Sequence, residues 1–166
     1  MIGEQHAEQL IRFLMEQDGR SDKLANLMLA AGCLSEVRNR RLIAGTDQTL
    51  RERMVKEAIR YDPPYFYEEW AADAEVDPTR TKAVSLIASV WRPEAHPWLR
   101  SAATTDSDWI VRRAAVQELA RGWKDNPDTL PILKDCARSG ENSDVRFVVV
   151  QELARGWRDD PETLVG

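Results

Sequence analysis

The chain has 166 residues, of which 43% are hydrophobic and 31% are charged, and its formal net charge is −5. This length fits one domain or a short run of repeats, with enough apolar residues to form a core. No apolar run approaches the ~20 residues of a membrane helix, and no secretory signal is visible at the amino terminus. An acidic chain is also at a disadvantage in sequence-independent nucleic-acid binding. We therefore expect a cytoplasmic protein with neither a membrane segment nor a nucleic-acid partner.

Apolar residues recur at helical spacing along the chain, and no segment shows the alternation of a strand. In chain order, the predicted helices span residues 4–17, 22–38, 47–61, 64–74, 78–91, 94–104, 108–122, 128–138 and 143–156. Asn126-Pro127-Asp128 provides an N-cap acceptor, a proline and an acid at one predicted helix start, and the Asp160-Pro161-Glu162 segment repeats the pattern. Gly122 and Gly156 fall where helices should end, either as C-terminal caps or as sites of close packing.

The sequence is internally repeated. Residues 111–130 and 145–164 are identical at fourteen of twenty positions, at an offset of 34 residues. A weaker copy, TRTKAVSLIASVW, starts at Thr79 with an offset of 32, and a fainter one starts at Leu50. Repetition at this period predicts a solenoid, in which each unit buries its apolar face against its neighbours.

We therefore expect an all-α fold, an α-α superhelix of right-handed sense with about four stacked helix pairs. It should form a single repeat domain over residues 1–166, with approximate units at 22–61, 62–91, 92–123 and 126–157. Val165 falls opposite Pro131 in the repeat, where a further helix would begin. For that reason we expect the chain to be a fragment of a larger protein.

Several segments carry a resemblance to known protein families. Ser143-Asp144-Val145-Arg146, and less tidily Asp108 with the following Val-Arg pair, resemble the start of the second helix in HEAT-like repeats of the phycobilisome-lyase type. LMLAAGCLSEVRNR and VRRAAVQELARGWKDNPDTLPILKD, within residues 24–164, resemble the carboxy-terminal helical region of bacterial NACHT-type signal-transducing ATPases. This resemblance implies a scaffold or sensor region of a larger regulatory ATPase. The chain itself has no GxxxxGK[ST] phosphate loop, so no ATPase activity is assigned to it.

The residues that could carry chemistry do not form a catalytic or metal-binding pattern. His6 and His96 are the only histidines, and a histidine without a second His or a Cys nearby cannot assemble a zinc or di-iron site. Cys33 and Cys136 lie in segments whose apolar residues have helical spacing, so we interpret both as core residues. We therefore expect no disulfide framework. We interpret the acidic run at residues 68–77 as a solvated helix face or as a docking patch for a basic partner. We therefore expect no enzyme activity, no metal and no cofactor.

Two kinds of residue recur at fixed repeat positions and favour structural roles. The tryptophans that end second helices are Trp91, Trp123 and Trp157. A catalytic residue is used once, whereas a packing residue recurs, so each indole should pack between the helices of its own unit and the next. The arginines that begin second helices are Arg80, Arg112 and Arg146. They should bond to an acid or carbonyl in the preceding turn. The alternative role of these arginines is ligand binding. For the whole chain, the alternative function is an enzyme on a HEAT-like scaffold, either a DNA alkyl-base glycosylase or a chromophore lyase subunit.

The polar face of the second helices is the predicted binding surface. Residues opposite the core stripe lie at i, i+4 and i+8 spacing, one above another on each helix. The predicted groove residues are Lys56, Arg60, Ser85, Ser89, Arg113, Gln117, Arg121, Gln151 and Arg155. Arginine and glutamine present directed donors, which suit an acidic or backbone-rich peptide, or other domains of a parent chain. The alternative is a plain solvated face, in which Arg121 pairs with Glu118 or Asp125.

Overall fold

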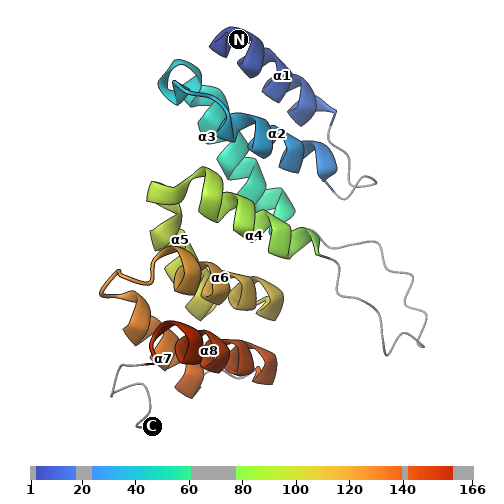
Figure 1. Cartoon of the computed structure of the whole chain (residues 1–166). Helices are drawn as coiled ribbons and strands as arrows, with labels where there is room; N and C mark the ends of the chain where they lie inside the picture. Colours follow the sequence, from blue (N-terminus) through green and yellow to red (C-terminus); the bar gives the residue numbers. More distant parts are fainter. Residues whose placement is uncertain (1–2, 18–23, 61–77, 140–141, 159–166) are drawn as a thin grey trace, which may run out of the picture. The chain divides into compact units, whose positions relative to one another are not determined.

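The structure is a computed structural model, and it describes residues 3–17, 24–60, 78–139 and 142–158 (Figure 1). Every regular element in these ranges is helical, which confirms the all-α prediction. The chain divides into two compact units, residues 1–90 and residues 91–166. The predicted helix at 64–74, the acidic run at 68–77 and the cap at 160–162 lie outside the described residues. None of the described helices is both long and apolar enough to cross a membrane.

The first unit contains α1 (Glu4–Glu16), α2 (Ala25–Ser35), α3 (Ala44–Arg53) and α4 (Thr79–Val90). Helix α1 packs along α2, which also contacts α3 and α4. Buried apolar residues from these helices form its core, among them Ile11, Leu27, Leu34, Leu50 and Val84. A 3-10 turn (Arg40–Ile43) precedes α3, and a π-helical turn (Met54–Ala58) follows it.

The π-helical turn departs from the single regular helix that the sequence predicts over residues 47–61. The backbone N–H of Ile59 donates to the carbonyl oxygen of Met54 at 3.2 Å, an i to i+5 hydrogen bond. The Met54 and Ile59 side chains are almost fully buried, at 0% and 1% exposure. Residues five apart do not share a face of a regular α-helix, so the wider turn lets both of them reach the core.

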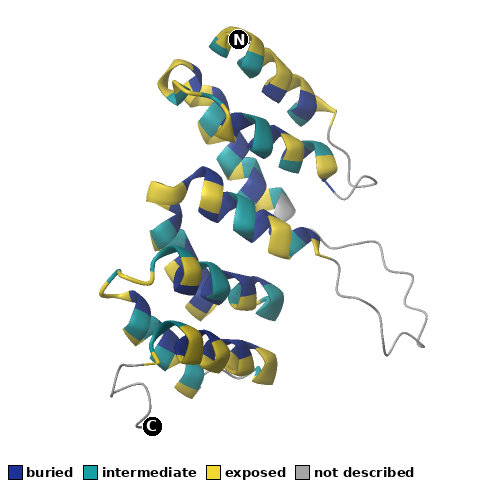
Figure 2. Ribbon diagram, viewed as in Figure 1, coloured by how far each residue is buried: buried dark blue, intermediate teal, exposed yellow. Residues whose placement is uncertain are grey.

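The second unit contains α5 (Arg92–Thr105), α6 (Trp109–Gly122), α7 (Thr129–Ser139) and α8 (Ser143–Gly156). Helices α5 and α6 form one helix pair and α7 and α8 form another, with α6 and α8 side by side (Figure 1). Figure 2 shows the buried residues of these helices on the sides that face one another. Leu99, Val111, Leu119, Leu133 and Val149 are fully buried there. These helices begin and end within two residues of their predicted bounds.

Local capping explains where these helices begin. Asp108 Oδ1 accepts a hydrogen bond from the backbone N–H of Ile110 at 2.8 Å at the start of α6. Asn142 Oδ1 accepts from the N–H groups of Asp144 and Val145 at the start of α8. Each bond satisfies a backbone donor that the first helical turn leaves without a partner. Asn126 Oδ1 likewise accepts from the N–H of Asp128, and α7 begins one residue later, at Thr129.

Gly122 and Gly156 are the last residues of α6 and α8, as predicted. No described glycine has a positive φ, so these helices do not end in the left-handed conformation of a glycine cap. A methyl group on Gly122 would lie 3.9 Å from Arg92, an ordinary contact. Neither backbone conformation nor lack of space therefore requires glycine at these two positions.

Candidate functional site

The polar face of α6 and α8 brings together five of the nine predicted groove residues. Arg113, Gln117 and Arg121 follow one another on α6, and Gln151 and Arg155 occupy the matching positions on α8. Four of the five are exposed, and Gln117 is half-buried. Because α6 and α8 lie side by side, these residues form two adjacent rows, which we call the α6–α8 face. Phe147, 63% exposed, begins the α8 row.

The other four predicted groove residues belong to the first unit. Lys56 lies in the π-helical turn and Arg60 follows it, both with exposed side chains. Ser85 and Ser89 lie on α4, where Ser85 is half-buried. The hydroxyl of Ser89 donates to the carbonyl oxygen of Leu86 in its own helix, at 3.1 Å. One groove that runs through all nine residues stays a prediction.

A buried carboxylate underlies the α6–α8 face. Glu152 is only 6% exposed, and its Oε1 atom lies 3.9 Å from Arg121 Nη2 and 3.5 Å from Arg155 Nη1. Both arginine side chains remain largely exposed, at 59% and 67%. Arg121 thus reaches an acid of the following helix pair, a contact that the sequence did not predict. Two cations share this one anion, and Arg113 is a further exposed cation on the same face.

Sequence reasoning missed Glu152 as a member of this face. Glu152 repeats Glu118 at the 34-residue offset, and the sequence shows both simply as polar positions of a second helix. In the structure Glu118 is half-buried and Glu152 is buried. The only signal in the sequence is the position of Glu152, which directly follows the predicted groove residue Gln151 and lies three residues before Arg155.

The recurring tryptophans contact cations. The guanidinium of Arg92 lies over Trp123, 5.2 Å from the ring centroid, and His96 stacks on the same indole at 5.8 Å between centroids. Lys124 Nζ lies 5.9 Å from the centroid of Trp157. These contacts agree with the predicted packing role, and so does the burial of Trp91, which is 3% exposed. Trp123 contacts the first helix of its own pair, and Trp157 contacts the residue that follows Trp123. Packing of the indoles against the next unit stays a prediction.

Arg112 makes the contact that was predicted for the arginines at the start of second helices. Its Nη1 donates to the carbonyl oxygens of Asp106 at 2.6 Å and Ser107 at 3.1 Å, which ties the turn between α5 and α6 to α6. Arg146, the equivalent residue of α8, is exposed, and residues 140–141 before it lie outside the described ranges. Arg80 is half-buried at the start of α4.

The histidines and cysteines occupy separate places. His96 is half-buried; desolvation and the positive charge of Arg100 lower its pKa. Cys136 is buried, with its thiol 3.7 Å from the carbonyl oxygen of Ala103, and burial raises its pKa. Cys33 is half-buried. Within the described ranges, no three His, Cys, Asp or Glu side chains are grouped so that they could hold a metal ion.

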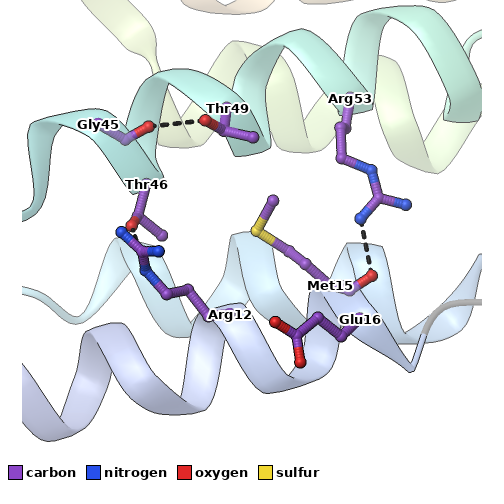
Figure 3. A pocket seen from close by; sticks show the side chains of 7 residues that line it. All are labelled: Arg12, Met15, Glu16, Gly45, Thr46, Thr49 and Arg53. Carbon is purple, nitrogen blue, oxygen red and sulfur yellow. Dashed lines mark hydrogen bonds between the residues drawn. The ribbon is translucent and has the colours of Figure 1, made fainter.

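A pocket of about 520 Å³ lies between α1 and α3 in the first unit (Figure 3). It is lined by Arg12, Met15, Glu16, Gly45, Thr46, Thr49 and Arg53. Thr46 donates to Glu8 at 2.7 Å and accepts from Arg12 Nε at 3.1 Å, and the hydrogen bonds that Glu8 accepts from Thr46 and Arg12 lower its pKa. Arg53 Nη1 donates to the carbonyl oxygen of Met15 at 2.7 Å. These polar groups form hydrogen bonds that join α1 to α3, so we interpret them as structural rather than as a ligand site.

Comparison with known proteins gives one match. The sequence pattern of HEAT repeats matches residues 68–154, more than half of the chain. No curated protein and no solved structure matches the sequence. The match covers α4 to α7 and most of α8, and so includes nearly all of the α6–α8 face.

Proposed function

The chain belongs to the HEAT-repeat family, and from this premise we propose that it is a non-enzymatic module that binds a protein or peptide on the α6–α8 face. HEAT repeats in general mediate protein interaction and scaffolding. The observation that carries the proposal is the double row of arginine and glutamine side chains, all exposed except the half-buried Gln117, over the buried Glu152. It does not depend on how the two units are arranged.

The chemistry of this face fits an acidic or backbone-rich peptide. Arginine can hold a carboxylate with two parallel hydrogen bonds, and glutamine can pair with a peptide group through both its donor and its acceptor. Glu152 holds Arg121 and Arg155 near one another, which reduces the conformational entropy that binding would cost. Exposed Phe147 adds an apolar contact at one end.

The context we propose is the scaffold or sensor region of a bacterial, cytoplasmic regulatory ATPase of the NACHT type. What supports this context is the sequence resemblance of residues 24–164. Other domains of such a parent protein are then candidate partners of the α6–α8 face. A phosphate loop in the same open reading frame would support this context, and an open reading frame without one would contradict it.

An enzyme on a HEAT-like scaffold is the competing class. A glycosylase would need accessible tryptophan, aspartate and arginine side chains on one face. The contacts of Trp123 with Arg92 and His96, and of Trp157 with Lys124, favour packing roles for these indoles. Titration with duplex DNA distinguishes a glycosylase from a peptide-binding module, because phosphate contacts make DNA binding strongly salt-dependent. Salt-dependent DNA binding would favour the glycosylase alternative.

The test of peptide binding is best made through Arg113, because Arg121 and Arg155 both neutralise a buried acid and their loss would disturb the fold. Peptides selected by display on the full chain would be measured by fluorescence anisotropy. We expect Arg113→Glu to weaken the selected acidic peptides by about ten-fold or more, since a cation becomes an anion at the contact. Arg138→Glu, the same charge change at an exposed position of α7, is the control.

Equal affinity of the wild-type chain and the Arg113→Glu variant would place the binding surface elsewhere. Thermal melting of both variants checks that any loss of affinity does not come from unfolding. A selection that yields no acidic peptide would also contradict the proposed chemistry.

A further inference from the structure

The segment that joins α2 to α3 buries every third residue and exposes the others. Arg40 is half-buried and Ile43 is 2% exposed, and both belong to the 3-10 turn before α3. A 3-10 turn repeats every three residues, so these two side chains share its inner side. The outer residues are exposed, and we call them the basic turn: Arg38, Asn39, Arg41 and Leu42. Figure 2 shows this segment largely exposed where the chain leads into α3.

The inner side fixes the conformation of this segment. Arg40 donates from Nε and Nη2 to the two carboxylate oxygens of Asp47, at 2.8 and 2.7 Å, and from Nη1 to the carbonyl oxygen of Val90. The backbone N–H of Leu42 donates to the carbonyl oxygen of Asn39 at 3.2 Å. Because these contacts hold the backbone in place, the basic turn is a preformed surface, and binding there would cost little conformational entropy.

The outer cations lack the partners that other arginines of the first unit have. Three arginines of this unit each pair with a carboxylate, namely Arg12, Arg40 and Arg53. Within the described part of the chain, Arg38 and Arg41 form neither an ion pair nor a hydrogen bond, and the Asn39 side chain does not cap the turn. Leu42, 66% exposed, is the most exposed of the large apolar side chains in the described ranges.

This combination of groups specifies the chemistry of a partner. Guanidinium groups bind carboxylates or phosphates, and Leu42 would be covered by an apolar group. An acidic protein segment offers both kinds of group. A nucleic acid fits less well, because its phosphates favour a broad basic surface and this chain has a formal net charge of −5. A membrane also fits less well, since stable anchoring takes more apolar burial than one leucine supplies.

We propose that the basic turn is a second docking surface, which binds an acidic protein segment whose carboxylates flank an aliphatic or aromatic side chain. The carboxylates pair with Arg38 and Arg41, and the apolar side chain covers Leu42. The Asn39 amide, a donor and an acceptor, is placed to bond the backbone of the segment. All four residues belong to the first unit, so this surface is independent of the α6–α8 face.

A capped peptide of glutamates around two central leucines is the probe, titrated at low salt into the full chain labelled with nitrogen-15. We expect the amide shifts to concentrate at residues 36–44. Arg38→Glu with Arg41→Glu should weaken binding by about ten-fold or more, because two attractive charges become repulsive. Leu42→Ser should weaken it by several-fold, since the apolar contact is lost. A peptide with alanine in place of leucine should bind wild type as weakly as the leucine peptide binds Leu42→Ser.

The matched control is Lys82→Glu with Arg138→Glu, which makes the same change in net charge at exposed positions of α4 and α7. This variant should keep the affinity of the wild type. The melting temperature of every variant should stay unchanged, because each altered side chain is exposed. Arg113→Glu should leave the shifts at residues 36–44 as they are, which separates this surface from the α6–α8 face.

Other results overturn the proposal. A peptide that does not bind, that shifts amides elsewhere, or that is weakened equally by the control variant would show that the basic turn does not dock it. Tighter binding of single-stranded DNA or of anionic vesicles, lost in the double-glutamate variant, would assign the turn to a phosphate ligand. A dimer in sedimentation that the same variant dissociates would assign it to a second copy of the chain.

Discussion

His96 lies against Trp123 with its Nε2 atom buried and without a hydrogen-bond partner. The charged groups that act on its pKa are Arg100 on its own helix and Asp128 before α7, while Arg92 lies over the same indole. Desolvation and Arg100 lower the pKa of His96, and Asp128 partly opposes them. A cation at this position would be partly desolvated and close to the positive charge of Arg100, so the folded protein favours the neutral imidazole.

This shift predicts a stability change in mildly acidic solution. The pKa of His96 is lower in the folded chain than the ~6.5 of an unfolded one, so below about pH 6.5 the unfolded state binds more protons. The stability that His96 contributes is thus complete above about pH 6.5 and falls as the pH drops towards its folded pKa. We expect the melting temperature of His96→Phe to fall less between about pH 7 and pH 5 than that of the wild type. His6→Phe, at an exposed position of α1, is the control, and equal slopes in all three chains would refute the assignment.

At the scale of the element, short polar residues decide where helices begin. The sequence pattern at the start of α8 draws attention to Ser143 and Asp144, but the structure makes Asn142 the cap, with hydrogen bonds of 2.8 and 3.2 Å from two backbone N–H groups. Asp108 has the equivalent role at the start of α6. The two caps are 34 residues apart in sequence, so the repeat includes its capping residue as well as its apolar stripe.

We expect Asn142→Ala to lower the free energy of unfolding by about 1 kcal/mol, the usual cost of losing an N-cap. Asn142→Asp keeps the acceptor and adds a charge that the helix dipole favours, so it should be neutral or slightly stabilising. Urea denaturation followed by circular dichroism measures both variants. Ser143→Ala, at an exposed neighbouring position, should leave the urea midpoint almost unchanged. If Ser143→Ala proves the more destabilising substitution, Asn142 is not the cap.

At the scale of the whole molecule, we expect the free energy of unfolding to be distributed over separate units of the chain. Residues 1–90 and 91–166 each form a compact unit with its own buried core. In solenoids, stability is close to a sum of unit and nearest-neighbour terms, so damage to one unit spreads mainly to its neighbours. Trp123 joins several contacts of the second unit, since both Arg92 and His96 lie on its ring.

Trp123→Ala should therefore destabilise the second unit by about 3 kcal/mol, the lower end of the range for such truncations, because the indole is only half-buried. Hydrogen exchange should accelerate in α5 to α8, while α1 and α2 keep their protection. Mass spectrometry of proteolytic fragments distinguishes the regions. Uniform acceleration across all described helices would instead mean that the chain unfolds as one cooperative body.

The helices and the repeat were readable from the sequence because their signals are local. Apolar spacing, the proline-containing helix start at residues 126–128 and the glycines at 122 and 156 act over one or two helical turns. These signals predict α6, α7 and α8 to within a residue or so. The 34-residue identity then predicts that the same packing recurs. The π-helical turn at Met54 was not predicted. Burial of both Met54 and Ile59 depends on the helices packed against this segment, which local sequence patterns do not specify.

Only the tertiary structure decided which polar residues meet and which apolar residues are covered. Glu118 and Glu152 are equivalent in sequence, yet Glu152 is buried beside arginines of two helices. Val116 and Val150 are equivalent too, yet one is fully buried and the other exposed. Each difference in burial depends on which helix packs alongside, and for α6 and α8 that neighbour is offset by 34 residues in the sequence. Local patterns are nearly identical in the two copies, so burial and charge pairing follow from the neighbour alone.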